Sequence, residues 1–536
     1  MRVASDADCL AAHSGLIRIE ADAHTSPDVV VYQSRGCVLV LGDDARIGPV
    51  AQRVAAHHTV VAFAPGVDVS DWGSKVTAVG RKVTHLKGYL GAFQGEIHVG
   101  DEITDIGPAS PNPSRCFDLV LDLSAQPLIA HEVKPLGYFA PGTDEQALTQ
   151  AIDAMRTLVG RFAKPRYFNY AGQLCAHSAS GFTGCTRCLS VCSAQAIRST
   201  GSNIAVNPHL CQGCATCTLS CPTGALTFRA PDRPTLGERL QAVLADAGKG
   251  VNLVVHGPAL DPAVPSAWAP YNKVVLFQVD PLPAFGDELW LRALALGAQT
   301  LVLLDDPALP AAARALLAER TAQVQTMMAA AGHHAERLAF LSADALPAWL
   351  AQRARQVRSE ASAVPVAPLK AWDKFKRLAW MDGLRQLGNT GQTQVTALPM
   401  GAPFGAVRVD AKRCSLCFAC VNLCPTRALN AGRESLHQLI FQESACVQCG
   451  LCVAACPEKA MSLQARVAPL DLVNLTSRVL HQDALLKCKS CGAPFISQKM
   501  LESSWNKLKD HPELSKGGYE TLMICPSCRQ REMLQM

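Results

Sequence analysis

Apolar and polar positions along residues 233–345 follow two periods, one typical of strands and the other of helices. Short apolar runs rich in Val and Leu predict three buried strands, at residues 251–257, 272–280 and 299–306. Longer segments with helical spacing follow the second and third of these runs, at 286–298 and 309–332. Because strands that alternate with helices form parallel sheets, we expect an α/β domain over residues 233–345.

Residues 1–165 show the same alternation. Residues 37–66 predict a strand, a helix and a second strand, and residues 115–124 predict a later strand. The turn after the first strand reads GDDARIG instead of the G-x-G-x-x-G of dinucleotide sites, and the sequence contains no phosphate-binding loop spacing. We therefore expect a second α/β domain without a nucleotide site, in which Cys37 and Cys116 are buried structural thiols.

Charge and hydropathy argue against two function classes. The chain has 50 Lys and Arg against 45 Asp and Glu, with 6% aromatic residues, which gives no indication of nucleic-acid binding. The basic run from Arg353 to Arg377, inside a helical linker expected at 346–405, predicts a solvated helix face. No apolar run approaches the roughly 20 residues that span a bilayer. Because the N-terminal sequence shows no secretory signal, we expect a cytoplasmic protein.

In that reducing compartment, 23 cysteines indicate metal or redox centres rather than disulfides. Three segments have the spacing C-x2-C-x2-C-x3-C-P, which is typical of 4Fe-4S cluster binding. Their cysteines are Cys211, Cys214, Cys217 and Cys221; Cys414, Cys417, Cys420 and Cys424; and Cys446, Cys449, Cys452 and Cys456. Zinc knuckles are the alternative, but zinc sites favour two C-x2-C pairs separated by a long gap.

Such motifs work in pairs, in which the first three cysteines of one motif join the fourth cysteine of the other. Residues 406–466 contain one such pair. The expected clusters are held by Cys414, Cys417, Cys420 and Cys456, and by Cys446, Cys449, Cys452 and Cys424. This region resembles the bacterial-type two-cluster ferredoxins, and the resemblance implies that fold for residues 406–466.

The motif at residues 211–222 needs a partner upstream for the same reason. The second, third and fourth ligand positions of that partner are filled by Cys185, Cys188 and Cys192. Phe182 stands where the first cysteine belongs. The upstream motif therefore needs its first ligand from elsewhere.

Cys175 is the candidate, because the residues between it and Cys185, AHSASGFTG, suit a loop that doubles back. We predict a second two-cluster module over residues 166–232. Its clusters are expected on Cys175, Cys185, Cys188 and Cys221, and on Cys211, Cys214, Cys217 and Cys192. Two alternatives stay open: His177 as the ligand, as in Rieske centres, or a three-iron cluster that lacks one ligand. Ser193 replaces the proline that usually follows the fourth cysteine, a change we expect to affect loop stiffness more than binding.

The tail, residues 467–536, carries two C-x2-C pairs, Cys488 with Cys491 and Cys525 with Cys528. A segment with helical pattern, 497–510, separates them. Two facing pairs make a tetrahedral sulfur cage, so we predict a zinc-ribbon-like domain with one Zn. A rubredoxin-like iron or a fifth iron–sulfur cluster is the alternative.

Two further resemblances concern the rest of the chain. Residues 287–304, followed by a long helix and residues 334–344, resemble the delta-subunit domain of methyl-viologen-reducing hydrogenase, which has cluster cysteines at its strand ends. Here the matching segments read FQVDPLP and LLDDPALP, so that cluster is expected to be absent. Residues 88–97, 117–129 and 174–188 resemble bacterial 4Fe-4S proteins encoded beside molybdenum formate dehydrogenases, which implies a setting and not a reaction.

The sequence thus predicts an α/β multidomain protein with two ferredoxin modules, two α/β domains and a zinc-ribbon-like tail. No paired carboxylates, nucleophile with base, flavin motif or pterin motif stands out, so we expect no catalytic residues. We expect an electron-transfer protein or oxidoreductase subunit with four 4Fe-4S clusters, working with formate dehydrogenase or another cytoplasmic oxidoreductase. The alternatives are an assembly or maturation factor for a molybdenum or iron–sulfur enzyme, and a catalytic subunit with an unrecognised flavin site.

Overall fold

The computed structural model describes most of the chain as two compact units. Unit 1 comprises Met1–Phe168, Cys192–Arg198 and Ala205–Cys214, and unit 2 comprises Asn169–Val191, Ser199–Ile204 and Ala215–Met536. The described residues are 16–19, 28–43, 45–67, 72, 74–261, 263–264, 268, 271, 273–354, 376–387, 394–432, 436–511 and 518–534.

Unit 1 is built on a five-stranded parallel sheet. Its strands, in sheet order, are β10 (Tyr138–Phe139), β9 (Leu119–Asp122), β3 (Cys37–Leu41), β4 (Thr59–Phe63) and β5 (Val76–Val79). Strand β3 is buried along its whole length, because it lies near the middle of the sheet with both faces covered. The strands expected at 37–66 and 115–124 are confirmed.

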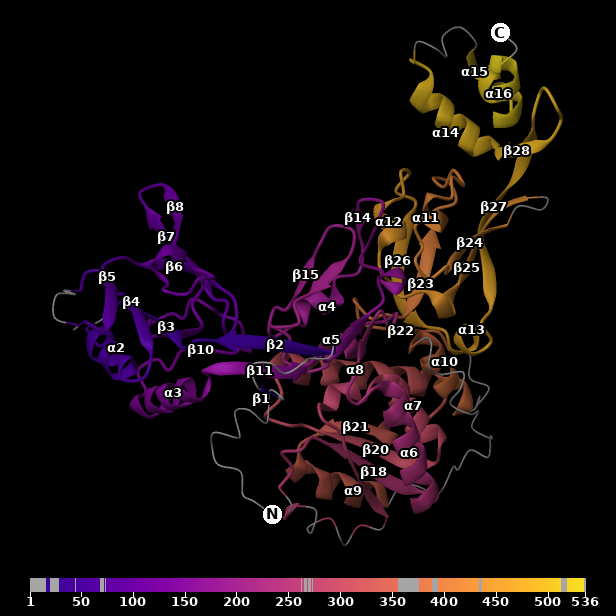
Figure 1. Ribbon diagram of the computed structural model, residues 1–536. Helices are drawn as coiled ribbons and strands as arrows, with labels where there is room; N and C mark the ends of the chain where they lie inside the picture. The colour runs from indigo at the N-terminus through magenta and orange to yellow at the C-terminus, as the bar shows by residue number, and fades with distance from the viewer. Residues whose placement is uncertain are drawn as a thin grey trace. The chain divides into compact units, whose positions relative to one another are not determined.

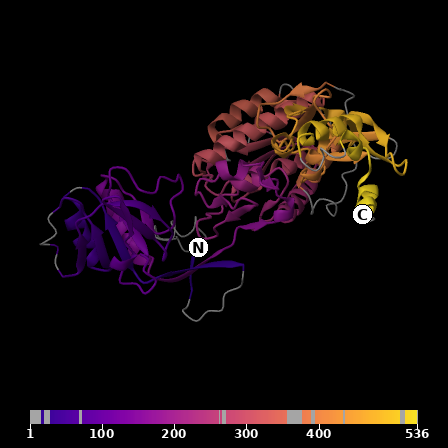
Figure 2. The ribbon, with the colours of Figure 1, turned by 90° about the horizontal axis from the view of Figure 1, so that it is seen from above.

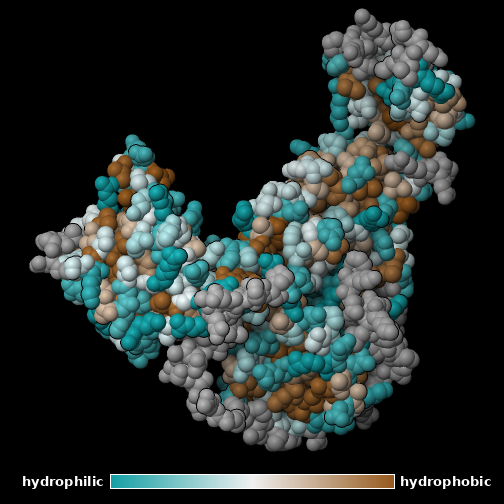
Figure 3. Space-filling view, in the orientation of Figure 1, coloured by the Kyte–Doolittle hydropathy of each residue, from teal (hydrophilic) through white to brown (hydrophobic). Residues whose placement is uncertain are grey.

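Different layers cover the two faces of this sheet. Helices α2 (Ile47–Ala55) and α3 (Glu145–Thr157) pack against the face that carries Val38 and Val40 (Figures 1 and 2). The opposite face packs against a three-stranded antiparallel sheet. That sheet consists of β6 (Val83–Lys87), β7 (Gln94–Val99) and β8 (Glu102–Asp105). Its outer end exposes apolar side chains over β7 and β8, visible in brown in Figure 3.

Three more strands of unit 1 form a separate antiparallel sheet: β1 (Ile17–Ile19), β11 (Gly160–Pro165) and β2 (Val29–Ser34). Lys164 on β11 is buried, and its ammonium donates to the carbonyl oxygens of His209 and Cys211 at 3.1 and 2.7 Å. This sheet therefore holds the cysteine-bearing segment Ala205–Cys214, which belongs to the same unit.

Unit 2 contains the second parallel sheet. Its strands, in sheet order, are β19 (Val274–Gln278), β18 (Val251–His256), β20 (Ala298–Leu304) and β21 (Leu338–Leu341). One face packs against α6 (Arg233–Ala247), α7 (Asp287–Ala295), α8 (Ala311–Ala330) and α10 (Lys376–Gln386), and the other against α9 (Leu346–Ala354). The alternating strands and helices expected here are confirmed, and the chain is mixed α/β.

The cysteine-rich parts of unit 2 are small strands joined by short helices. One group pairs β22 (Thr396–Ala397), β26 (Met461–Val467) and β23 (Gly405–Val409), and another pairs β24 (Leu429–Gly432), β25 (Leu436–Gln442), β27 (Ser477–Lys487) and β28 (Pro494–Ser497). Residues 168–228, which both units share, contain β12 (Phe168–Tyr170), the β13–β14 hairpin (Ser178–Ala179 and Phe182–Thr183), β15 (Ile197–Ser199), β16 (Ile204–Val206) and β17 (Leu226–Phe228). The tail adds helices α14 (Gln498–Leu508), α15 (Gly518–Leu522) and α16 (Pro526–Leu534).

The basic run is not a solvated helix face where the structure describes it, so that expectation is wrong. Lys376, at the start of α10, is 7% exposed, and its ammonium lies 3.9 Å from carboxylate oxygens of both Asp287 and Glu288. Asp287 also pairs with Arg320. A charge buried among opposite charges avoids the cost of an unpaired ion. Residues 355–375 of the run lie outside the described residues.

Candidate iron–sulfur and metal sites

Three cavities of unit 2 are each lined by four cysteines that come from two separate segments. They contain Cys414, Cys417, Cys420 and Cys456; Cys424, Cys446, Cys449 and Cys452; and Cys175, Cys185, Cys188 and Cys221. The other residues that line each cavity are mostly apolar. Three cavities with the same number of sulfur donors suit the same group three times. The donor set fits a 4Fe-4S cluster, which takes four thiolates.

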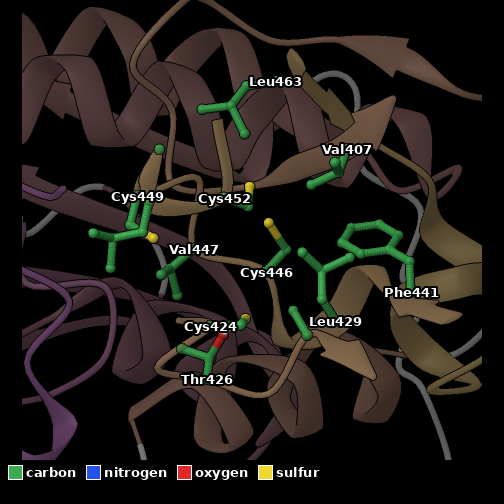
Figure 4. A pocket seen from close by; sticks show the side chains of 13 residues that line it. Val407, Cys424, Thr426, Leu429, Phe441, Cys446, Val447, Cys449, Cys452 and Leu463 are labelled. Atoms are coloured by element: carbon green, nitrogen blue, oxygen red, sulfur yellow. Dashed lines mark hydrogen bonds between the residues drawn. The ribbon is translucent and has the colours of Figure 1, made fainter. Parts of the chain in front are cut away.

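The crossing of cysteines between motifs is visible in the second cavity (Figure 4). Cys446, Cys449 and Cys452 approach from one loop, and Cys424 from the preceding motif. Strands β24 and β25 pair between the two motifs, from Leu429 with Phe441 to Gly432 with Gln438, and this pairing returns the chain to the same cavity. The structure thus groups these side chains in the arrangement expected from the sequence, while their binding of iron stays a prediction.

The cysteine loops are wrapped by left-handed backbone. In the loop that begins at Cys446, Gln448 and Gly450 have φ of 53° and 87°. Leu416 and Phe418 have φ of 57° and 58° in the corresponding positions after Cys414. Residues other than glycine rarely adopt a positive φ, because this backbone conformation costs energy. Such residues are found most often at functional sites. The curvature turns successive sulfur atoms toward one centre.

The displaced first cysteine of the upstream motif is placed by a hairpin. Strands β13 and β14 pair antiparallel, and the two turn residues, Ser180 and Gly181, both have positive φ, as a tight hairpin requires. The backbone amide of Cys185 donates to the carbonyl of Ala176 at 2.9 Å, next to Cys175. The expected loop therefore doubles back, and Cys175 lines the same cavity as Cys185. Phe182, in the vacated position, is 39% exposed.

His177 is buried at the edge of this cavity, but both of its ring nitrogens are engaged. Nδ1 lies 3.0 Å from the carbonyl oxygen of Cys185, which can only accept, so Nδ1 carries the proton. Nε2 lies 2.7 Å from the hydroxyl of Ser199, which donates to it. With its lone pair occupied, His177 is a poorer iron ligand than Cys175, and the geometry favours the cysteine.

The fourth expected set is divided between the units. Cys192, Cys211 and Cys214 belong to unit 1, and Cys217 belongs to unit 2. Burial, with a smaller contribution from the thiols of Cys214 and Cys192, raises the pKa of Cys211 to about 11. Those three thiols therefore interact with one another, and the cluster on all four stays a prediction.

The tail forms a sulfur site of another kind. The sulfur atoms of Cys488, Cys491, Cys525 and Cys528 all lie within 4.8 Å of one another. Those of Cys491 and Cys525 are 3.8 Å apart. A tetrahedral zinc ion with bonds of about 2.3 Å needs sulfurs about 3.8 Å apart, so this cage fits a single ion. Iron with four thiolates has the same shape, and the choice between the two metals stays open. The helix expected between the pairs is confirmed as α14.

Burial raises the pKa of Cys188 and Cys420 to about 12 and that of Cys449 to about 11. The tail site is mixed. The backbone N–H of Cys525 donates to the sulfur of Cys488 at 3.2 Å and lowers the pKa of Cys488 to about 6. A hydrogen bond from the Ala493 backbone lowers the pKa of Cys491, but hydrogen bonds to the thiols of Cys528 and Cys488 outweigh it and raise this pKa to about 11. Because metals bind thiolates, the thiols with a raised pKa must release protons when a metal group binds.

Several residues that act on these sites have no signal in the sequence. The side-chain amide of Gln448 donates to the sulfur of Cys446 at 3.3 Å, and Arg187 donates to Cys185 at 3.6 Å. The hydroxyl of Ser193, in the place of the usual proline, donates to Glu132 at 2.8 Å. Hydrogen bonds to sulfur change the reduction potential of a bound cluster, and only the tertiary structure shows which side chains reach the sulfur atoms.

The expected structural thiols of the first domain are buried. Cys37 is 2% exposed and Cys116 is 8% exposed. Burial raises the pKa of Cys37 to about 11, so this thiol is neutral and unreactive near pH 7. Cys9, the remaining cysteine, lies outside the described residues.

Comparison with known protein families supports the iron–sulfur assignment. The family model of the 4Fe-4S dicluster domain matches residues 402–461, and that of the 4Fe-4S binding domain matches residues 204–227. The chain therefore contains two ferredoxin-type 4Fe-4S domains. No curated protein matches the chain. None of the described helices combines the length and apolar character that crossing a membrane requires.

We expect Cys175→Ala to lower the iron content by about four atoms, one cluster, because an iron with one ligand fewer is easily lost. His177→Gln keeps a side chain that can hydrogen-bond and should leave iron content unchanged. Elemental analysis of both variants after anaerobic reconstitution decides between the ligands. The reverse pattern would make His177 the ligand, and no change in either would indicate an open-site or three-iron cluster.

Cys424→Ala should remove the cluster of the other motif, because its sulfur lines the cavity of Cys446, Cys449 and Cys452. Alkylation with iodoacetamide and peptide mapping should then find those three cysteines modified. Cys414, Cys417 and Cys420, adjacent to Cys424 in sequence, should stay protected. Cys456→Ala is the matched control and should give the opposite pattern. Modification of the Cys414 group in the Cys424 variant would show that the cysteines do not cross.

Proposed function

We propose that this chain is an electron-transfer protein with four 4Fe-4S clusters that exchanges electrons with an oxidoreductase. The observation that carries the proposal is the set of three cavities, each lined by four cysteines from two segments. The fourth cluster, on Cys192, Cys211, Cys214 and Cys217, follows from the same motif pairing. When bound, such clusters accept and release single electrons.

The protein's own residues would set how easily each site is reduced. Apolar walls, including Leu429 and Phe441 around the cavity of Figure 4, keep water from the sulfurs. Donors such as Gln448 and the backbone N–H of Ala460, 3.3 Å from the sulfur of Cys456, stabilise added negative charge. Both effects change the reduction potential of a bound cluster, and neither requires the transfer of a proton.

Formate dehydrogenase is the partner that we propose, on the resemblance of residues 88–97, 117–129 and 174–188 to proteins encoded beside that enzyme. The domain at 233–345 contains no cysteine. We propose that it serves as a docking or spacing unit, since it offers no sulfur ligand for a cluster of its own. The tail, in this proposal, holds a structural zinc ion that fixes α14 to α16.

Anaerobically reconstituted protein should contain about 16 iron atoms and one zinc, from four cubanes and one closed four-thiolate site. Elemental analysis checks both numbers in one sample. Cys491→Ser should lose the zinc and keep the iron, which serves as the internal control. About eight iron atoms in the unaltered protein would refute the four-cluster count.

Electron exchange can be tested directly with formate as the reductant. The oxidised protein, mixed with formate dehydrogenase and formate, should lose its iron–sulfur absorbance, because the clusters accept electrons from the enzyme. The same mixture without formate should not bleach. Bleaching by dithionite but not by the enzyme would refute formate dehydrogenase as partner and keep electron transfer. Stable capture of an enzyme that lacks its cofactors, without bleaching, would instead favour the assembly-factor alternative.

A further inference from the structure

Within unit 2, the part of the first ferredoxin module that carries Cys175 and Cys185 lies against the second module at the base of the β13–β14 hairpin. A Cβ atom on Gly184 would lie 2.7 Å from the side chain of Leu451 and 3.2 Å from the carbonyl oxygen of Cys449. Strand β14 also contacts α12 (Leu451–Ala454). Only glycine permits this approach, since any side chain at position 184 would push the hairpin away from the Cys449 loop.

Arg187 fastens the same contact. Its guanidinium donates to the carbonyl oxygen of Val447 at 3.2 Å, in the second module, and to that of Gly401 at 2.9 Å, just before that module. The same group donates to the sulfur of Cys185 at 3.6 Å and lines the cavity of that cysteine. One side chain therefore contacts a candidate cluster ligand of the first module and the backbone between two candidate ligands of the second.

Cys185 and Cys449 lie on either side of this contact. Arg187 donates to the sulfur of Cys185 and to the carbonyl oxygen of Val447, two residues before Cys449. The carbonyl oxygen of Cys449 in turn faces Gly184, the residue before Cys185. Cys185 and Cys449 each line a four-cysteine cavity. Electron tunnelling weakens steeply with distance, so a contact that holds these two cavities together favours electron transfer at this point.

Two further cations, in addition to Arg187, contact both modules. Lys376 donates to the carbonyl oxygens of Thr218 and Leu219, both at 2.8 Å, in the first module. The adjacent Arg377 donates to the carbonyl oxygens of Ser444 and Cys446, both at 2.8 Å, in the second. Two consecutive residues of α10 thus hold one cysteine loop of each module in a fixed relation.

We propose that Cys185 and Cys449 form the junction at which electrons pass between the two modules, and that Arg187 is the residue that positions them. The proposal rests on the electron-transfer function above and adds an order of sites. In this order, electrons pass from the cluster bound by Cys414 to the cluster bound by Cys446 and then, across the junction, to the cluster bound by Cys185. The predicted cluster on the set that includes Cys211 comes last, and the order can also run in reverse. One electron leaves the reduced site on one side, which is oxidised, and enters the site on the other, which is reduced. No bond forms or breaks.

The junction can be isolated in a full-length double variant, Cys211→Ala with Cys456→Ala, which removes the outer cluster of each module. The remaining protein should hold about eight iron atoms, four in each junction cluster. After full reduction by dithionite, we expect a paramagnetic resonance spectrum that is split by magnetic interaction between the two clusters. Adding Arg187→Ala should cause loss or narrowing of that splitting, because the two loops are no longer held together.

Lys412→Ala is the matched control. Lys412 precedes Cys414 by two positions, as Arg187 follows Cys185 by two, and it is exposed and makes no side-chain contact described at the junction. The control removes the same charge and should leave the splitting unchanged. Equal spectra for the two substitutions would overturn the role of Arg187, and two independent signals at eight irons would overturn the junction itself.

The failure of the proposed function gives a different result. Unaltered protein that takes up no iron, or whose clusters dithionite cannot reduce, would refute electron transfer and the junction together. If only the double variant loses iron, the comparison moves to the four-cluster protein. There, Arg187→Ala must narrow the interaction signal at unchanged iron content while Lys412→Ala must not, and identical spectra would overturn the proposal.

Discussion

The cysteine loops depend on buried and half-buried cations that donate to their backbone carbonyls. A loop that turns its sulfurs and amides inward leaves carbonyl oxygens facing the rest of the protein, where an unpaired acceptor is costly. Lys164, Arg187, Lys376 and Arg377 meet this need, each donating to carbonyls at or near a candidate ligand. Such cations also oppose the negative charge of four thiolates. The acidic pair at Asp287 and Glu288 in turn offsets the charge of Lys376 inside the core.

The upstream motif shows how a ligand can move in sequence and keep its place in space. A tight hairpin lies between Cys175 and Cys185, so the two remain adjacent although the usual spacing is lost. The turn tolerates this because Gly181 and Ser180 accept positive φ. The family model that matches residues 204–227 does not reach this hairpin, consistent with the unusual spacing of the motif. Gly184 lies at the base of this hairpin, where the second module packs against the backbone of Gly184.

Two kinds of sulfur site occur in one chain, and their geometry separates them. In the tail, four sulfurs within 4.8 Å enclose one ion, and a backbone N–H keeps Cys488 ionised near neutral pH. In the cavities, four cysteines and apolar walls suit a larger group, and burial raises the pKa of thiols such as Cys420. The two parallel sheets carry no cysteine ligands, so their part is to support the sites from outside.

The sequence by itself determined the elements that depend on local pattern. Motif spacing grouped the cysteines of 406–466, because the spacing identifies the fourth cysteine that crosses to the paired motif, and apolar runs located strands such as β18 and β20. The sequence did not determine which distant side chains complete the sites. It misjudged Lys376 as solvated, because a charged residue is identical in sequence whether or not Asp287 faces it. The sequence left both Cys175 and His177 as candidate ligands, because only the folded structure shows that the Ser199 hydroxyl donates to the free ring nitrogen of His177. Contacts between segments far apart in the chain, such as Arg187 with Val447, exist only after folding, and so the tertiary structure alone decided them.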